Sequence, residues 1–401
     1  MNHNSPDRLR YWWWLRQGLD SSLTGVAPAG ILGRAGWARS VGGASPYLTL
    51  FSRGGWSREA IDAAVAALEI HELPSARGCT CVVPAADYAL ALQAAAPFAD
   101  SEMSVARKLG ATEDEIERLC ERVLNVLESG SLDPEAIRSA AGDAVKNFGP
   151  EGQKKGLSTT MPVALGRLQV RGQIRRVPIN GRLDQQRCRY ALWSPGPIGE
   201  SRLSTEQIGT ELARRYFRWI GPATLAEFQW FSGLGVKAAK ASLASLDLVP
   251  LEESSNRLLF AEDREALASL NVPTQPRYSL IGSLDSISLL RRDLRGLLAE
   301  EDLDRPVMED NKVRPLGGLA DLPSNAILDR GRVVGLWEYD PYGDGAVAWM
   351  SFQKPDAAMV AAVAQTEAWI RAQLGDVRSF SLDSPKSRAP RIAKLRERAA
   401  G

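Results

Sequence analysis

The chain has 401 residues, of which 44% are hydrophobic and 24% charged, so we expect a globular protein with two to four domains. It contains only two histidines and four cysteines, which leaves little basis for a histidine-dependent triad, a zinc site or a disulfide framework. No apolar run approaches the roughly 20 residues that a bilayer crossing needs. The first residues lack the pattern of a secretory signal, so we expect a cytoplasmic protein.

The net charge of +1 conceals a segregation of charge along the chain. Residues 100–143 hold 11 acidic and 5 basic side chains, whereas residues 146–193 hold 10 basic and 2 acidic ones. The stretch from Ser384 onward carries 6 basic residues and 1 acidic residue. This pattern predicts a positive face that binds nucleic acid, although charge alone fits a solvated surface equally well.

The first predicted unit covers residues 1–99. Ser57 is placed to cap a helix over residues 59–68, and residues 78–84 are typical of a strand. Three tryptophans at residues 12–14 cannot all face one core, because neighbours on a helix lie about 100° apart. We expect one or two of them to be exposed or to lie at a boundary, with packing between units favoured over stacking on a flipped base.

The second predicted unit covers residues 100–200 and contains a basic hairpin. A helix is expected over residues 158–170, followed by strands over 173–178 and 182–193. An Asn-Gly pair at residues 180–181 separates the strands, and it is the strongest short hairpin signal because both turn positions need positive φ. A helix followed by such a hairpin is typical of a winged helix.

The third predicted unit, residues 201–272, has the clearest winged-helix pattern. Ser204 and Gln207 have the spacing of a capping box at the start of a helix that runs to Trp219. Two more helices over 223–231 and 236–246, joined by a glycine-containing turn, and a hairpin over 248–260 complete the pattern.

Residues 273–401 have a different character. Strands are predicted over 278–284, 325–328, 333–339 and 346–352, and helices over 288–299 and 355–374. The basic stretch at the end is expected to be mobile. The predicted fold class is therefore α+β, with three tandem winged-helix units followed by a C-terminal β-rich, barrel-like domain.

Several segments, taken in order, resemble the AlkZ-like DNA glycosylase family. They are residues 77–84 (RGCTCVVP), 180–187 (NGRLDQQR), 221–225 (GPATL), 235–237 (GVK), 284–285 (LD) and 328–337 (LDRGRVVGLW). The resemblance covers about residues 11–378, and it implies tandem winged helices and a C-terminal β domain. It also implies an enzyme that excises alkylated or crosslinked bases from double-stranded DNA without a metal or organic cofactor. Association with the nucleoid and a monomeric state are the working expectations.

Family glycosylases carry a Gln-apolar-Gln or Gln-apolar-Asp motif early in the first unit. The corresponding residues 41–47 have Gly42 and Ala44 at the two polar positions, and neither can orient water or stabilise an oxocarbenium ion. Two other residues are therefore candidates for catalysis. Gln17 is the nearest source of an amide, and Asp285 is a carboxylate for which a helix cap is the alternative interpretation.

Two functions remain open on these grounds. The first is a DNA glycosylase with other catalytic groups, and the second is a non-catalytic winged-helix DNA-binding protein, either a regulator or a damage sensor. A protein-interaction scaffold would show no salt-dependent DNA binding. The polar cluster of Glu69, His71 and Glu72 is explained by a neutral surface histidine.

The candidate DNA-binding residues are mostly basic. The hairpin arginines are expected to contact phosphates, with a merely solubilising role as the alternative. The two glutamines could read base edges, and Lys237 and Lys240 lie on the last helix of the third unit, where DNA contact and a scaffolding role are equally open. The candidates are Lys154, Lys155, Arg175, Arg176, Arg182, Gln185, Gln186, Arg187, Arg189, Lys237, Lys240, Arg291 and Arg292.

Overall fold

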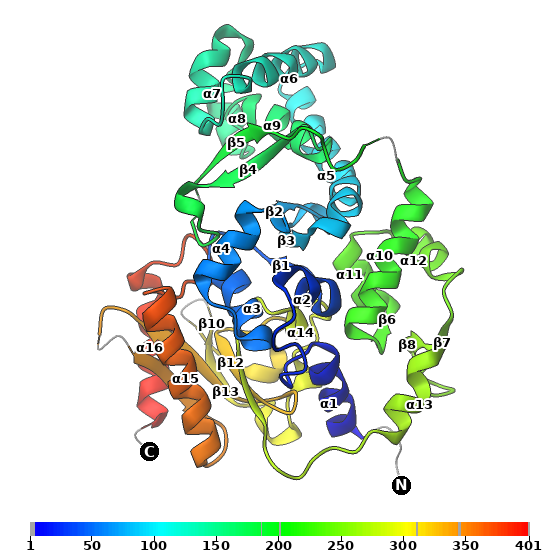
Figure 1. The fold of residues 1–401 in the computed structure, drawn as a ribbon, viewed down its shortest axis with the longest axis vertical. Helices are drawn as coiled ribbons and strands as arrows, with labels where there is room; N and C mark the ends of the chain where they lie inside the picture. Colours follow the sequence, from blue (N-terminus) through cyan, green and yellow to red (C-terminus); the bar gives the residue numbers. More distant parts are fainter. Residues whose placement is uncertain (1–4, 186, 200–201, 310–311, 344–345, 400–401) are drawn as a thin grey trace.

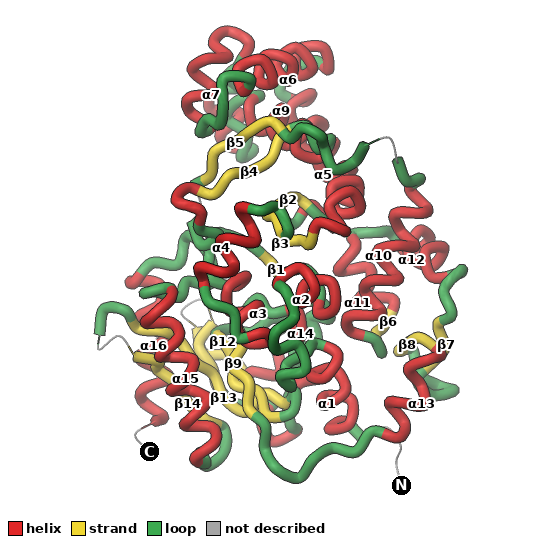
Figure 2. The backbone as a smooth tube through the Cα atoms, in the orientation of Figure 1, coloured by secondary structure: helices red, strands yellow, loops and turns green. Residues whose placement is uncertain are grey.

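The computed structural model describes residues 5–185, 187–199, 202–309, 312–343 and 346–399. Within these residues the fold is mixed α/β and contains five small sheets, none of which closes on itself. Figure 2 shows that the strands fall into separate groups, with the largest sheet in the lower half of the view and one hairpin set apart near the top. No helix of the described residues has both the length and the hydropathy that crossing a bilayer requires.

The N-terminal part combines four helices with a three-stranded sheet. The helices are α1 (Pro6–Arg16), α2 (Pro28–Ala35), α3 (Ser45–Gly54) and α4 (Arg58–Ala66), and the strands are β1 (Ala38–Arg39), β2 (Ile70–Pro74) and β3 (Thr80–Pro84). The sheet order is β1-β3-β2, with antiparallel pairing throughout. The side chain of Ser57 accepts a hydrogen bond from Ala60 N–H, which confirms the predicted cap of α4.

All three tryptophans of α1 are buried. Trp12, Trp13 and Trp14 are 7%, 2% and 1% exposed. Trp12 Nε1 donates to Gly221 O at 2.8 Å, whereas Trp14 Nε1 donates to Ser279 Oγ at 2.8 Å. None of the three is exposed, and their indole N–H groups bond to segments far away in the sequence, which agrees with packing between segments, the favoured interpretation.

The next group of elements forms the upper part of Figure 1. It consists of α5 (Tyr88–Lys108), α6 (Glu113–Leu127), α7 (Pro134–Ala141), α8 (Gly149–Lys154), α9 (Met161–Val170), β4 (Ile174–Pro178) and β5 (Cys188–Leu192). Its core is separate from the others and includes Ile116, Val123, Ala164 and Leu168. The acidic stretch is therefore a set of amphipathic helices, and the basic hairpin β4–β5 follows them.

The connection between β4 and β5 is longer than a two-residue turn. Asn180 and Gly181 do adopt the expected positive φ, at 60° and 73°, yet β5 begins only at Cys188. The reason is Leu183, which is 1% exposed and belongs to the core that the N-terminal helices share with the C-terminal sheet and α15. Its N–H donates to Tyr47 Oη at 2.9 Å, so the loop is tied to α3 instead of continuing the strand.

The third group matches its predicted elements closely. It contains α10 (Thr205–Ile220), β6 (Ala223–Thr224), α11 (Leu225–Ser232), α12 (Val236–Leu243), β7 (Leu248–Pro250), β8 (Arg257–Phe260) and α13 (Ala261–Ser269). Ser204 and Gln207 make both hydrogen bonds of the capping box, and the strands form a sheet of order β6-β8-β7. Local signals were strong here because α10 and α11 each begin with a complete capping box.

The C-terminal part is built on a four-stranded antiparallel sheet of order β14-β13-β12-β9. Its elements are β9 (Tyr278–Ile281), α14 (Ser286–Leu289), β10 (Pro306–Glu309), β11 (Lys312–Pro315), β12 (Asn325–Asp329), β13 (Arg332–Asp340), β14 (Ala346–Ser351), α15 (Ala357–Gln373) and α16 (Pro385–Ala399). The sheet is open among the described strands, so the barrel-like closure is not confirmed. The predicted helix over 288–299 is wrong, since Arg292 has a φ of 53° and the helical backbone stops before it.

Helices α15 and α16 cover opposite faces of this sheet. Trp337 of β13 packs in the cluster that includes Met359 of α15, whereas Leu336 packs in the cluster that includes Leu395 of α16. The basic stretch expected to be mobile is therefore an ordered helix over residues 385–399. Its Arg391 pairs with the buried Glu338 at 3.0 Å, which explains why these cations fold back onto the protein.

Candidate functional site

A cavity of about 900 Å³ lies between the N-terminal sheet and the basic hairpin. Figure 1 shows β4 and β5 facing β2 and β3 across this region. The cavity is lined by Ser40, Val41, Gly42, Glu72, Thr80, Asp133, Pro134, Glu135, Arg176, Ile179, Gln185, Arg187, Cys188, Tyr190 and Ser381. Residues far apart in the sequence thus form one polar cavity next to the Gly42 loop.

Glu72 is a lining carboxylate that two other side chains hold in place. Ser40 Oγ donates to Glu72 Oε1 at 2.5 Å, and Arg176 Nη1 donates to Glu72 Oε2 at 3.3 Å. Arg176 is held in turn by Gln169, whose Oε1 accepts from Arg176 Nε at 3.1 Å. The side chain of Glu72 is 12% exposed, so the two donors orient a carboxylate that keeps limited access to the cavity.

His71 lies in the same strand but is not a surface residue. It is 1% exposed, and its ring contacts Trp193 at a centroid distance of 5.1 Å. Burial, followed by the charges of Arg175 and Arg176, lowers the pKa of His71 to about 3. The surface interpretation of this histidine is therefore wrong, because both faces of β2 are covered here: the successive residues Ile70 and His71 point to opposite faces, and both are buried.

The loop that carries Gly42 and Ala44 is covered by the chain segment after α15. Ala44 N–H donates to Arg378 O at 2.8 Å, and Ser381 N–H donates to Val41 O at 3.0 Å. A Cβ atom on Gly43 would lie 2.4 Å from Ser379 O, so only glycine permits this approach. Residues 378–381, here named the covering segment, therefore take the space beside this loop.

The two candidate catalytic residues meet in a buried cluster, not in a cavity. Gln17 and Asp285 are 0% and 1% exposed. Arg53, whose side chain is fully buried, donates to both Asp285 oxygens at 2.8 Å and to Gln17 Oε1 at 3.0 Å. Asp285 also caps α14 by accepting from Ile287 N–H. The structure gives neither side chain access to a substrate, so the alternative interpretation of Asp285 as a helix cap fits the geometry.

The candidate cations fall into two groups. The first group forms no ion pair with any described residue, and apart from the half-buried Arg175 its members are exposed: Lys154, Arg175, Arg187, Arg189, Lys237 and Lys240. The second group is neutralised within the protein. Lys155 pairs with Glu151, Arg176 with Glu72, and Arg182 with Asp184. Gln185 is exposed and donates to Asp184 at 3.3 Å, while Gln186 lies outside the described residues.

Arg291 and Arg292 do not form an open DNA-binding surface. Arg291 is 2% exposed; it pairs with Asp293 at 2.8 Å and lies 3.4 Å from the centroid of the Trp13 ring. Arg292 pairs with Asp321 at 2.9 Å. The DNA contact predicted for Arg291 is wrong, because acidic and aromatic neighbours enclose its guanidinium.

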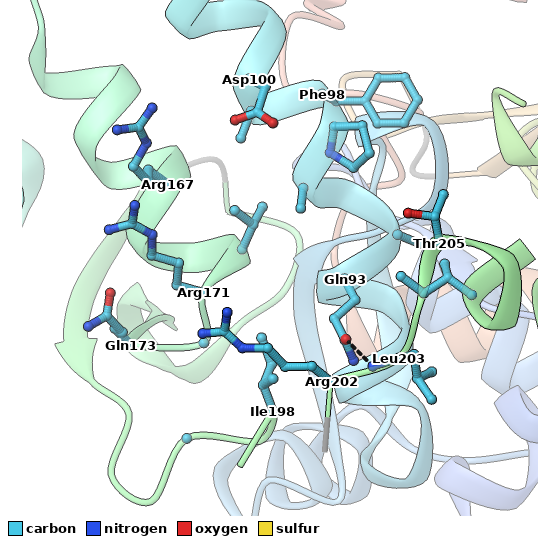
Figure 3. A pocket seen from close by; sticks show the side chains of 18 of the residues that line it. Gln93, Phe98, Asp100, Arg167, Arg171, Gln173, Ile198, Arg202, Leu203 and Thr205 are labelled. Atoms are coloured by element: carbon cyan, nitrogen blue, oxygen red, sulfur yellow. Dashed lines mark hydrogen bonds between the residues drawn. The ribbon is translucent and has the colours of Figure 1, made fainter. Parts of the chain in front are cut away.

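A second large cavity, of about 840 Å³, lies where α5, α9 and residues 193–199 and 202–205 meet. Figure 3 shows Arg167, Arg171 and Arg202 around it, with the hydrogen bond from Leu203 N–H to Gln93 Oε1 at 2.9 Å. Arg167 and Arg171 are both paired with Glu117, each at 2.7 Å. Two of the arginines that line this cavity are therefore already paired with a carboxylate of the protein.

No pattern in the sequence links Glu72 and Ser40 as one site. Glu72 belongs to β2 and Ser40 follows β1, and these two strands both pair with β3. Arg176 comes from β4, about a hundred residues later. Only the tertiary arrangement brings the three together; the sequence offered Glu72 in a polar cluster and Arg176 as a candidate cation, with no signal that linked them.

Comparison with known proteins agrees with this fold. The AlkZ-like family, described as DNA glycosylase AlkZ-like, matches residues 38–380. The structure is similar to that of the DNA glycosylase AlkZ of Streptomyces sahachiroi, with a TM-score of 0.68, 20% sequence identity, and coverage of 94% of this chain and 98% of that chain. No curated protein sequence matches the chain. Because the family match spans most of its length, the protein belongs to the AlkZ-like DNA glycosylase family.

Proposed function

We propose that this protein binds double-stranded DNA and hydrolyses the N-glycosidic bond of alkylated or crosslinked bases. The observation that carries the proposal is the cavity between the N-terminal sheet and the basic hairpin, in a chain of this family. Its volume of about 900 Å³ lies within the range of small-molecule sites, and a flipped nucleotide is an occupant of that class. We further propose that the protein acts as a monomer on chromosomal DNA in the cytoplasm.

The unpaired cations suggest where the duplex runs. Arg187 and Arg189 are exposed at the β4–β5 hairpin, and Arg187 lines the mouth of the cavity with Gln185. Lys237 and Lys240 are exposed on α12. Because phosphate contacts position a protein on DNA, we propose that the backbone of the duplex follows the hairpin and that the cavity receives the target base.

The domain limits belong to the same proposal. We propose three winged-helix units over residues 1–99, 100–200 and 201–272, followed by a β-rich domain over 273–401. The helix-turn-helix sequence of α10 to α12 with the sheet β6-β8-β7 supports this for the third unit. In the first two units the support is weaker, since their sheets have other arrangements.

A non-catalytic DNA-binding protein is the second candidate. It is favoured by Gly42 and Ala44, whose positions lack the polar side chains of the family motif, and by the covering segment that lies against this loop. This alternative predicts salt-dependent binding without base release.

The experiment measures both properties on one duplex that carries a single N7-methylguanine. Arg187→Ala/Arg189→Ala is expected to reduce the slope of log K against log salt by up to about 2, since each phosphate contact contributes ~0.9. The matched control is Arg138→Ala/Arg214→Ala, which also removes two exposed charges, each paired within its helix. An unchanged slope in the hairpin variant would contradict the proposed path of the DNA.

Base release above the spontaneous depurination rate supports the glycosylase. Salt-dependent binding without release supports the second candidate. A protein that neither binds nor releases base has neither function.

A further inference from the structure

The cavity contains several carboxylates, but they differ in their freedom. Glu135 pairs with Arg138, and its side chain is 75% exposed. Asp133 caps α7 by accepting from Ala136 N–H at 2.8 Å. Among the described lining residues, Glu72 is the carboxylate that combines two properties. Its side chain is only 12% exposed, and two side-chain donors fix its position.

The two donors leave capacity for a third partner. Ser40 Oγ occupies one position on Oε1, and Arg176 Nη1 occupies one on Oε2. A carboxylate oxygen has two lone pairs, so each oxygen can accept one more hydrogen bond. Gly42 adds no side chain to the same cavity, which leaves room beside the carboxylate for a water molecule and a sugar ring.

We propose that Glu72 is the catalytic carboxylate of this cavity, with the N7-alkylated purine nucleotide of the proposed function as its substrate. The inference rests on the proposed glycosylase function and assigns its chemistry to a residue. The alkylated purine is already positively charged, so it leaves readily once the sugar is stabilised. The negative charge of Glu72 stabilises the oxocarbenium ion that develops at C1′.

The reaction balances with water as the only co-reactant. The C1′–N9 bond breaks, and its electron pair stays on the purine, which becomes neutral. Water attacks C1′ and forms the new C1′–O bond. Glu72 accepts the proton that this water loses and releases it to solvent, and the products are the free base and an abasic site.

Ser40 and Arg176 are positioning residues in this scheme. They hold the carboxylate so that its free lone pairs face the cavity, and Gln169 holds Arg176. The variant Glu72→Asp moves the carboxylate away from these two donors by one methylene group. It should therefore slow the reaction without abolishing it.

The test is single-turnover release of N7-methylguanine from duplex DNA by Glu72→Gln. We expect the rate to fall by about 100-fold or more, in the range of general acid–base catalysis. The variant should bind DNA at least as tightly as the wild type does. Glu69→Gln is the matched control, because Glu69 is exposed, lies just before β2 and is not part of the cavity lining. It is expected to keep the wild-type rate.

Glu72→Asp guards against a folding artefact, because it keeps the charge. We expect it to regain part of the rate that Glu72→Gln loses, at an unchanged thermal unfolding temperature. A wild-type rate in Glu72→Gln overturns the role of Glu72 and leaves the glycosylase function intact. Equal losses in Glu72→Gln and Glu69→Gln also overturn it, since the effect would then be a general one of charge. If the wild-type protein binds DNA but releases no base, the glycosylase function fails and the inference fails with it.

Discussion

The pair between Arg53 and Asp285 joins α3 to α14, and its disruption has a predictable cost. Both side chains are at most 1% exposed, so a change of Asp285→Asn leaves a buried guanidinium without its counter-charge. Breaking a buried pair from one side costs about 3–5 kcal/mol. Asparagine also caps helices well, so the cap of α14 is retained and the loss reflects the charge. We expect a destabilisation of about 3 kcal/mol, at the low end, because an amide oxygen still accepts one bond.

The assay is urea unfolding monitored by tryptophan fluorescence, since the chain has 11 tryptophans, three of them in α1 next to Gln17. The control is Glu135→Gln, whose pair with Arg138 is exposed and is worth about 0–1 kcal/mol. The double variant Arg53→Met/Asp285→Asn should recover part of the loss, since replacing both charges removes the stranded one.

Two results would refute this reasoning. The first is a change below about 1 kcal/mol for Asp285→Asn, which would mean that the pair contributes less than its burial implies. The second is loss of base release in Asp285→Asn with unchanged unfolding. That outcome would return Asp285 to the catalytic machinery.

Two further predictions concern the cavity and its surroundings. Gly43→Ala is expected to displace the covering segment, because its Cβ would lie 2.4 Å from Ser379 O. Faster tryptic cleavage after Arg378 checks this. The control is Gly33→Ala, where no atom lies within 4 Å of the added Cβ, and it should be cleaved at the wild-type rate. His71→Phe is expected to make stability less sensitive to acid. The unfolded histidine titrates near 6.5 and the folded one near 3, so the unfolded state binds more protons between these values and wild-type stability falls by up to about 1.4 kcal/mol per pH unit as the pH drops through this window. Equal pH slopes of unfolding free energy for wild type and His71→Phe would contradict this.

Helix starts and turns could be predicted because they depend on residues a few positions apart. The capping box of Ser204 and Gln207 and the positive φ of Asn180 and Gly181 are as expected. A side chain that caps a backbone N–H three residues away needs no distant partner. The same locality explains why the elements of residues 201–272 were predicted well.

The length of the basic hairpin's loop depended on a distant contact. Leu183 is buried with α3 and its N–H bonds to Tyr47, a residue more than a hundred positions earlier. The alternation of a strand says which residues are apolar, but not which core receives them. The sequence therefore predicted the turn residues correctly, but not the length of the loop that follows them.

The candidate site divides in the same way. Which residues can do chemistry or bind phosphate follows from the sequence, and the exposed Arg187 and Arg189 were among the candidates. Which of them are free was decided by tertiary structure, since Arg291 is enclosed by a distant ring and nearby acids. A charged side chain is available to a ligand only if the fold supplies no counter-ion, and sequence separation hides that partner.

The amino-acid sequence by itself determined several helix caps, the hairpin turn residues and the family. Tertiary structure decided that Gln17 and Asp285 both bond to Arg53, and that Glu72 faces a cavity. The physical reason is the range of the interactions. Caps and turns are satisfied within one or two turns of chain, whereas a buried charge or a cavity wall is completed by strands and helices that only folding brings together.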